Sequence, residues 1–204
     1  PQITGLSWVV VSEDKKQVTF HPLYSSGTAA VRGDTPLLPN YHYYWEVKML
    51  TDTYGTDIMV GVGSEKVNVS DSQFKFTSLL GQDGESYGLS YTGAVRHAAA
   101  VARDSPGFCR GTVVGVRLDL WRGTLEFYLN RQPQGMLPST SITYPRFQGD
   151  IIPFAALSRF LRACTYTTLM NLSLISGKVT PLKICQQSSF THHSFYSTKG
   201  HILR

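Results

Sequence analysis

The chain has 204 residues, of which 42% are hydrophobic and 16% charged, and its formal net charge is +5. The hydrophobic share is enough for a core, and so low a charged share argues against disorder over most of the length. The 19 basic residues are scattered, which predicts a mildly positive solvated surface; a basic face that attracts an acidic peptide is the alternative. With 18 glycines and 10 prolines, we expect many turns and few long helices.

Strand patterns dominate the first half of the chain. Val18–Phe20 follows the charged turn Glu13–Lys16 and reads as a short strand. Tyr43–Met49 has the aromatic and β-branched composition of a longer one. Its alternation places Glu46 and Lys48 on one face, and Trp45, Val47 and Met49 on the other.

The middle of the chain contains one strand of a different kind. Ile58–Val62 is a continuous apolar run closed by glycine, which is typical of a strand that is covered on both faces. Tyr87–Tyr91 is bracketed by Gly84 and Gly93 and predicts a short strand. Between these two strands, one short helix is expected within Phe74–Leu80.

The second half predicts a hairpin and two more strands. Thr112–Leu118 alternates, Asp119–Gly123 reads as a turn, and Thr124–Leu129 is the returning strand. Asp150–Leu157 and Cys164–Leu169 complete the set. Several short strands separated by turns, with little helical periodicity, indicate an all-β sandwich.

Three cysteines, Cys109, Cys164 and Cys185, are an odd number without a Cys-x-x-Cys pair. They predict neither a structural zinc site nor a disulfide framework, and they favour a reducing compartment, the cytoplasm or the nucleus. No window is apolar enough for a membrane span. From about Gln186 the chain turns rich in Ser, Thr and His, and we expect an extension outside the sandwich.

No pattern predicts an enzyme, a cofactor or a metal. The chain lacks the Gly-x-Ser-x-Gly elbow of a hydrolase. Cys109 has a neighbouring cation that can lower its pKa, and His97 lies upstream, but a plain loop cysteine is the simpler interpretation. Asp57 and Asp119 suit turns and strand ends. Aromatic strands with a basic charge leave single-stranded nucleic acid as a remote third possibility.

Five ordered motifs resemble the SPRY-domain SOCS-box protein family. They are Gly27–Gly33, Tyr43–Val47, Tyr54–Gly63, Ser78–Gly88 and Leu118–Phe127, and the resemblance runs from Trp8 to Thr168. It implies a SPRY-type β-sandwich of two bent antiparallel sheets over residues 1–170. Residues 171–204 would form a short helical and polar C-terminal extension.

The same resemblance implies a function in protein recognition. The SPRY domain would bind a short Asn-containing peptide of a target protein at loops along one edge. A C-terminal SOCS box would recruit elongin B, elongin C and a cullin, which makes such a protein the substrate-recognition subunit of a cullin-RING E3 ubiquitin ligase.

The C-terminus departs from the family pattern. An elongin-binding box carries an aliphatic residue four positions before a cysteine, and Pro181 occupies that place before Cys185. Few residues follow to build the next helices, so the box is truncated, degenerate or absent. The rival hypothesis is therefore a SPRY scaffold of a larger assembly without a ligase role.

The resemblance carries ten peptide-contacting positions over to this chain. They are Phe20, His21, Pro22, Tyr24, Gly55, Thr56, Phe76, Ser158, Arg159 and Phe160. An extended peptide loses water from its backbone on binding, and rigid loops with the Thr56 hydroxyl can restore those hydrogen bonds. Tyr24 and Phe76 would supply contact area, and Arg159 an ion pair with an acidic ligand residue.

Several of these residues also fit structural roles. Phe20 alternates with Val18 and suits the core equally well, Pro22 shapes a turn, and Phe76 can pack its helix onto a sheet. Thr56 can satisfy a local backbone group, and Arg159 can be a solvated surface residue.

Overall fold

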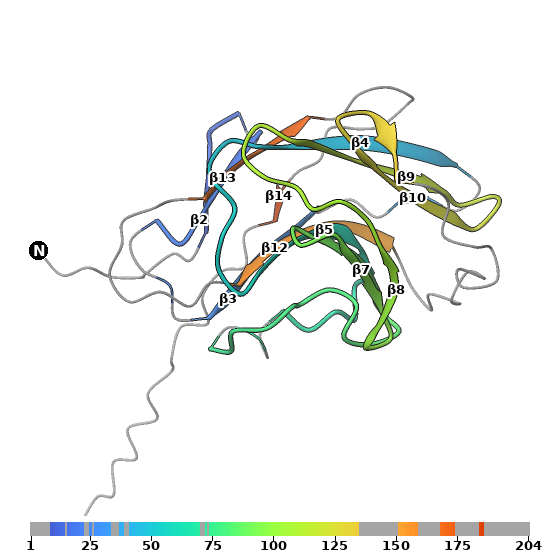
Figure 1. Ribbon diagram of the computed structural model, residues 1–204, viewed down its shortest axis with the longest axis horizontal. Helices are drawn as coiled ribbons and strands as arrows, with labels where there is room; N and C mark the ends of the chain where they lie inside the picture. The colour runs from blue at the N-terminus through green and yellow to red at the C-terminus, as the bar shows by residue number, and fades with distance from the viewer. Residues whose placement is uncertain are drawn as a thin grey trace, which may run out of the picture.

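The computed structural model describes residues 9–14, 16–22, 25, 27–33, 37–38, 41–69, 72, 74–134, 151–158, 168–173 and 184–185 (Figure 1). Over these ranges the regular secondary structure is β-strand. The strands are β1 (Val9–Val11), β2 (Gln17–Phe20), β3 (Thr28–Gly33), β4 (His42–Met49), β5 (Asp57–Ser64), β6 (Ser86–Ser90), β7 (Ala94–His97), β8 (Ala100–Asp104), β9 (Val113–Asp119), β10 (Thr124–Leu129), β11 (Gln132–Pro133), β12 (Ile151–Ser158), β13 (Thr168–Ser173) and β14 (Ile184–Cys185).

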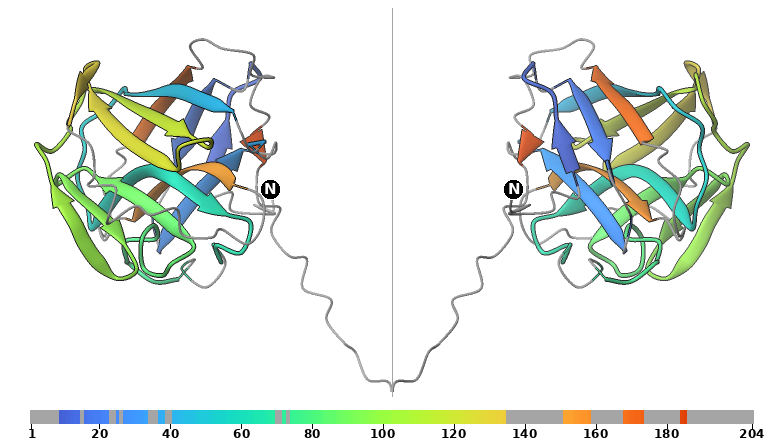
Figure 2. Two further views of the ribbon diagram at one scale, coloured as in Figure 1. Left: turned by 90° about the vertical axis from the view of Figure 1, so that its right-hand side faces the viewer. Right: turned by 90° about the vertical axis from the view of Figure 1, so that its left-hand side faces the viewer.

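The strands form two antiparallel sheets that stack as layers (Figures 1 and 2). One sheet has the order β1-β2-β13-β4-β9-β10-β11, and the other has the order β14-β3-β12-β5-β6-β7-β8. We call them sheet A and sheet B. The predicted all-β sandwich of two antiparallel sheets is thereby confirmed, including the β9–β10 hairpin.

The inner face of sheet A follows the predicted alternation. On β4, Tyr43, Trp45, Val47 and Met49 are buried in the main core. The inward residues of β9 and β10 pack in the same cluster, with Val116 paired to Trp45 across the strands. Full burial of each large apolar side chain stabilises the fold by about 1.5–3 kcal/mol.

Strand β5 is buried at every residue, as its continuous apolar run predicts. Ile58, Val60 and Val62 face the main core between the sheets. Met59 points to the other side and packs in a second cluster with Leu80. The chain between β5 and β6 runs across the outer face of sheet B (Figure 1), so this strand is covered from both sides.

The short helix predicted within Phe74–Leu80 is wrong, because the described residues there form turns and bends. The Thr28 hydroxyl of β3 donates to the carbonyl of Lys75 at 2.7 Å and accepts from the Thr77 N–H at 3.3 Å. A side chain from a distant strand thus binds backbone groups that a helix would have paired internally.

Parts of the predicted C-terminal extension lie in the sheets. Strand β13 continues past residue 170 to Ser173 between β2 and β4. Strand β14 pairs with β3, with Cys185 opposite Arg32. Residues 174–183 and 186–204 lie outside the described ranges, as do residues 164–167 of the strand predicted over Cys164–Leu169.

The outer face of sheet A carries a buried carboxylate, Glu46, on the face that the strand pattern assigned to Glu46 and Lys48. Glu46 is 4% exposed. Its Oε1 accepts from Arg131 Nε at 3.0 Å and from the Tyr44 hydroxyl at 2.9 Å. The hydrogen bond from Arg131 lowers the pKa of Glu46, which outweighs the upward effect of burial, and the Tyr44 hydroxyl lowers it further.

The hydrogen-bonded pair of Glu46 and Arg131 predicts that the stability of the fold depends on pH. Because the pKa of folded Glu46 lies below its ordinary 4.5, the carboxylate stabilises the fold fully above that value, and the contribution disappears as the pH falls through the folded pKa. Glu46→Gln should lower the free energy of unfolding by about 1–2 kcal/mol at pH 7, and the difference should shrink toward pH 3. Urea unfolding at several pH values measures it, with Glu13→Gln in an exposed turn as the control. A difference independent of pH would show that the charge of Glu46 is not involved.

Candidate functional site

One end of sheet B brings together residues that are far apart in the sequence. In the strand register, Ser158 of β12 lies between Thr28 of β3 and Asp57 of β5. Gly55 and Thr56 lead directly into Asp57, and the segment around Phe76 is bound to the Thr28 hydroxyl. We call Thr28, Gly55, Thr56, Asp57, Phe76 and Ser158 the sheet-end cluster.

The centre of the sheet-end cluster is Asp57, which is 3% exposed. Its Oδ1 accepts from the Ser90 hydroxyl at 2.6 Å, and its Oδ2 accepts from the Ser78 hydroxyl. Ser90 also bonds to Thr92 at 2.8 Å. A buried carboxylate is costly unless hydrogen bonds satisfy it, so this network joins β5, β6 and the segment before β6 into one unit.

Gly55 is held in place by Tyr91, the residue that follows β6. Its carbonyl accepts from the Tyr91 hydroxyl at 2.9 Å. Its φ of 110° is in the region that favours glycine. The backbone ahead of β5 is therefore fixed, and the exposed side chain of Thr56 stands on a rigid turn.

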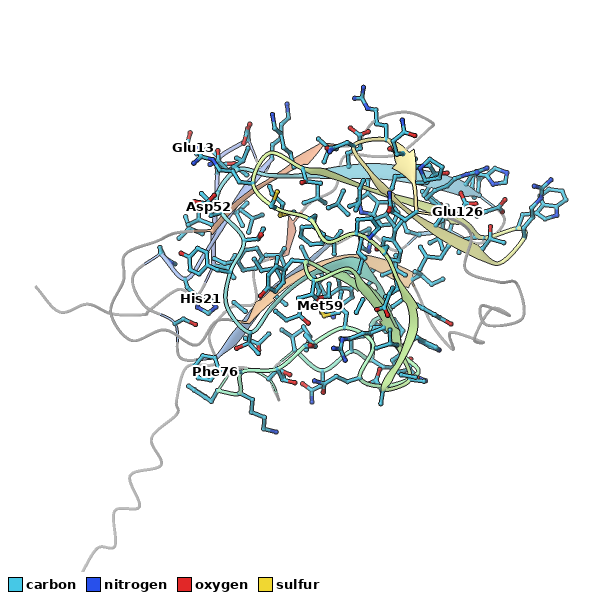
Figure 3. The ribbon with its side chains drawn as sticks, in the orientation of Figure 1. Glu13, His21, Asp52, Met59, Phe76 and Glu126 are labelled. Atoms are coloured by element: carbon cyan, nitrogen blue, oxygen red, sulfur yellow. The ribbon has the colours of Figure 1, made fainter. Side chains whose placement is uncertain are left out.

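The structure places the predicted site residues in different environments. Thr56 is exposed, and Gly55, Pro22 and Phe76 are half-buried. Ser158 is the last residue of β12. In the view of Figure 3, His21 and Phe76 both lie toward the left-hand side of the molecule, away from Glu126.

Two predicted residues are turned inward. Phe20 is fully buried in the main core, which is the structural role that its alternation with Val18 also allowed. His21 is 3% exposed, with a φ of 49°. Tyr24, Arg159 and Phe160 lie outside the described residues. The peptide contacts of all ten positions stay predictions.

Sequence reasoning missed the polar network behind the cluster. Asp57 was assigned to a turn or strand end, and Ser78, Ser90 and Thr92 were not singled out. The available signal was an aspartate directly ahead of a strand buried on both faces, because such a carboxylate needs hydrogen-bond partners. Which residues serve as partners of Asp57 depended on the pairing of β5 with β6.

Cys109 and His97, the two residues considered for catalysis, contact different parts of the fold. The exposed Cys109 lies near Thr112, at 3.9 Å between Sγ and Oγ1. His97 stacks on Tyr87 with 3.6 Å between ring centroids, and its Nδ1 is 2.9 Å from the Ser86 carbonyl.

In the described part of the chain, no group of His, Cys, Asp and Glu residues is arranged to hold a metal ion. Nor does that part include a helix long and apolar enough to cross a membrane.

Two stacked antiparallel sheets, with loop segments gathered at one end of sheet B, define a β-sandwich. The SPRY domain model matches residues 42–171, so the chain belongs to the SPRY domain family. As a SPRY domain, it is a protein-interaction module rather than an enzyme.

Curated relatives narrow the resemblance further. The chain is 47% identical over 164 residues to SPRY domain-containing SOCS box protein 3 of Xenopus tropicalis, which covers 79% of this chain and 45% of that protein. It is 39% identical over 184 residues to the protein of the same name from Xenopus laevis, covering 86% and 51%. The chain thus spans about half the length of these relatives.

A solved structure supports the fold independently. The crystal structure of a human SPRY domain superposes with a TM-score of 0.60, covering 85% of this chain and 99% of that one. The sequence identity is 14%, so this likeness concerns the architecture alone.

Proposed function

We propose that the sheet-end cluster binds a short Asn-containing peptide of a target protein. The observation that carries this proposal is that Ser158 pairs in register with both Thr28 and Asp57. Gly55 and Thr56 directly precede Asp57, and the segment around Phe76 is bound to the Thr28 hydroxyl. The resemblance to the SPRY-domain SOCS-box family assigned Gly55, Thr56, Phe76 and Ser158 to the site from the sequence, and the nearness of their segments at one end of sheet B supports a shared site.

The geometry suits recognition of an extended chain. Tyr91 fixes the Gly55 backbone and Thr28 fixes the segment beside Phe76, so the receptor loses little conformational entropy on binding. The exposed Thr56 hydroxyl and nearby backbone groups can replace the water lost by the peptide. An Asn side chain has two N–H donors and a carbonyl acceptor, and a rigid pocket can match both.

Phe76→Ala should weaken binding to the best peptide about tenfold, because a half-buried aromatic supplies much contact area. The peptide would first be selected from an array of short sequences and then titrated against the purified domain by fluorescence anisotropy. Trp121→Ala, an exposed aromatic on the β9–β10 turn, is the matched control and should leave the affinity unchanged. Indifference of the domain to every Asn-containing peptide on the array would refute the proposal.

We further propose that the whole protein is the substrate-recognition subunit of a cullin-RING E3 ubiquitin ligase, with elongin B, elongin C and a cullin as partners in the cytoplasm or nucleus. The support is the similarity to relatives named for a SOCS box. Pull-down of elongin B and C with the full-length protein tests it.

One observation favours the rival scaffold function. Ile184 and Cys185 form strand β14 and pair with β3, so the cysteine considered for an elongin-binding box belongs to sheet B. If the full-length protein does not retain elongin B and C, the domain is better described as a scaffold component that binds its peptide without a ligase role.

A further inference from the structure

A second surface lies at the turn of the β9–β10 hairpin. A shallow depression of about 430 Å³ is lined by His42, Arg117, Trp121 and Arg122, which we call the hairpin-tip surface. It lies at the His42 end of β4, whereas Met49 at the other end of that strand leads toward Gly55. The labelled Glu126 of β10 and the labelled Phe76 are correspondingly on opposite sides in Figure 3.

The turn that carries this surface is held rigidly. Asp119 Oδ1 accepts from the N–H groups of Trp121 at 3.0 Å and Arg122 at 2.8 Å. The Leu120 N–H donates to the Tyr41 carbonyl at 3.0 Å, which ties the turn to the start of β4. Burial alone would raise the pKa of Asp119, but the Arg122 N–H, His42 and the Trp121 N–H together hold it below its ordinary value. The carboxylate therefore stays ionised at neutral pH.

Trp121 is 72% exposed on this rigid turn. A single exposed hydrophobic residue needs no explanation, but Trp121 borders a depression. The preceding residue, Leu120, is also bound to the backbone of Tyr41, a second exposed aromatic. Tryptophan on a preformed turn provides contact area at a low entropic cost, and it is enriched among residues that dominate binding energies.

Around Trp121, the acidic side chains are buried more deeply than the basic side chains that they contact. His42 Nδ1 lies 3.1 Å from Asp119 Oδ2, with the His42 side chain 62% exposed and that of Asp119 4% exposed. Arg117 Nη1 lies 3.2 Å from Glu126 Oε2, with exposures of 49% and 12%. Arg122 is exposed, and its backbone rather than its guanidinium bonds to Asp119. The carboxylate of Asp119 is buried and that of Glu126 is largely buried, while the side chains of Arg117 and Arg122 are exposed, so the surface presents their positive charge.

We propose that the hairpin-tip surface binds an acidic peptide segment of a partner protein. Carboxylates of that segment pair with Arg117 and Arg122, and an apolar side chain packs on the Trp121 indole. Guanidinium groups are suited to this because each has several N–H donors in a fixed plane. A peptide fits better than single-stranded nucleic acid, whose binding platforms stack successive bases on a series of aromatic side chains along a basic groove.

The test uses a fluorescein-labelled peptide of Glu and Leu residues and its uncharged counterpart, in which Gln replaces every Glu. The native domain should bind the Glu peptide at least tenfold more tightly, by anisotropy at fixed ionic strength. Arg122→Glu and Trp121→Ala should each weaken binding about tenfold, which corresponds to about 1.4 kcal/mol. Arg110→Glu, an exposed charge reversal at the Met49 end of β4, is the matched control.

Two variants distinguish binding at the hairpin-tip surface from binding at the sheet-end cluster. Phe76→Ala should leave binding of the Glu peptide unchanged, and Trp121→Ala should leave binding of the Asn-containing peptide unchanged. Equal affinity for the Glu and Gln peptides, or equal loss in Arg110→Glu and Arg122→Glu, would overturn the proposal. So would tighter binding of an oligothymidylate that Arg122→Glu abolishes, because the surface would then be a nucleic-acid site.

Discussion

Asp57→Ala is expected to lower the free energy of unfolding by about 3 kcal/mol and to weaken peptide binding at least tenfold. The substitution removes the acceptor for the hydroxyls of Ser78 and Ser90 in a buried environment. Leaving buried donors unsatisfied costs about 1–3 kcal/mol for each group. Because Asp57 follows Thr56 directly and pairs in register with Ser158, loosening of this network also displaces the proposed peptide contacts.

Urea unfolding and peptide titration at one temperature measure the two effects. Asp52→Ala, an exposed aspartate in the loop that precedes Gly55, is the matched control, and it should change stability by less than about 0.5 kcal/mol. Asp57→Asn should be intermediate, since an amide keeps one acceptor oxygen. Equal stability of the Asp57 and Asp52 variants would show that the network around Asp57 does not hold the sheet-end cluster together.

Gly61→Ala is expected to cost about 3 kcal/mol or more, although alanine is the smallest possible addition. A Cβ at this position would lie 1.9 Å from the Tyr87 carbonyl oxygen and 2.9 Å from the Gly88 Cα. Both are backbone atoms of β6, which pairs with β5 in the middle of sheet B. The clash can be relieved only by moving strands that β12 and β7 hold from either side, so overpacking is severe here.

The matched control for this prediction is Gly84→Ala in the turn before β6. A Cβ at Gly84 would meet no atom within 4 Å, so the change should be neutral or slightly stabilising through loss of unfolded-state entropy. Thermal and urea unfolding of both variants give the comparison. If Gly61→Ala is as stable as Gly84→Ala, the close approach of β5 and β6 is not a constraint on the fold.

Most of the fold could be predicted from local sequence patterns, and each prediction that failed has a specific cause. Alternation correctly assigned the inward faces of Tyr43–Met49, and the continuous run at Ile58–Val62 correctly indicated a doubly covered strand. Alternation put Glu46 on the same face as Lys48, but it could not show that Glu46 is buried there by its contacts with Tyr44 and Arg131. The helix predicted within Phe74–Leu80 failed because Thr28, far earlier in the chain, binds its backbone.

By itself, the sequence determined most of the longer strands and the hairpin turn, because β-branching, alternation and turn residues act between neighbours along the chain. Its ordered motifs separately carried the resemblance to the SPRY family. Only the tertiary structure decided that Thr28, Asp57 and Ser158 share one end of sheet B, and that Asp57 is satisfied by two serines from other segments. It likewise decided that, near Trp121, Asp119 is buried and Glu126 largely buried while the Arg117 side chain is exposed. The physical reason is that these contacts depend on strand order and register, which long-range pairing sets and local spacing does not encode.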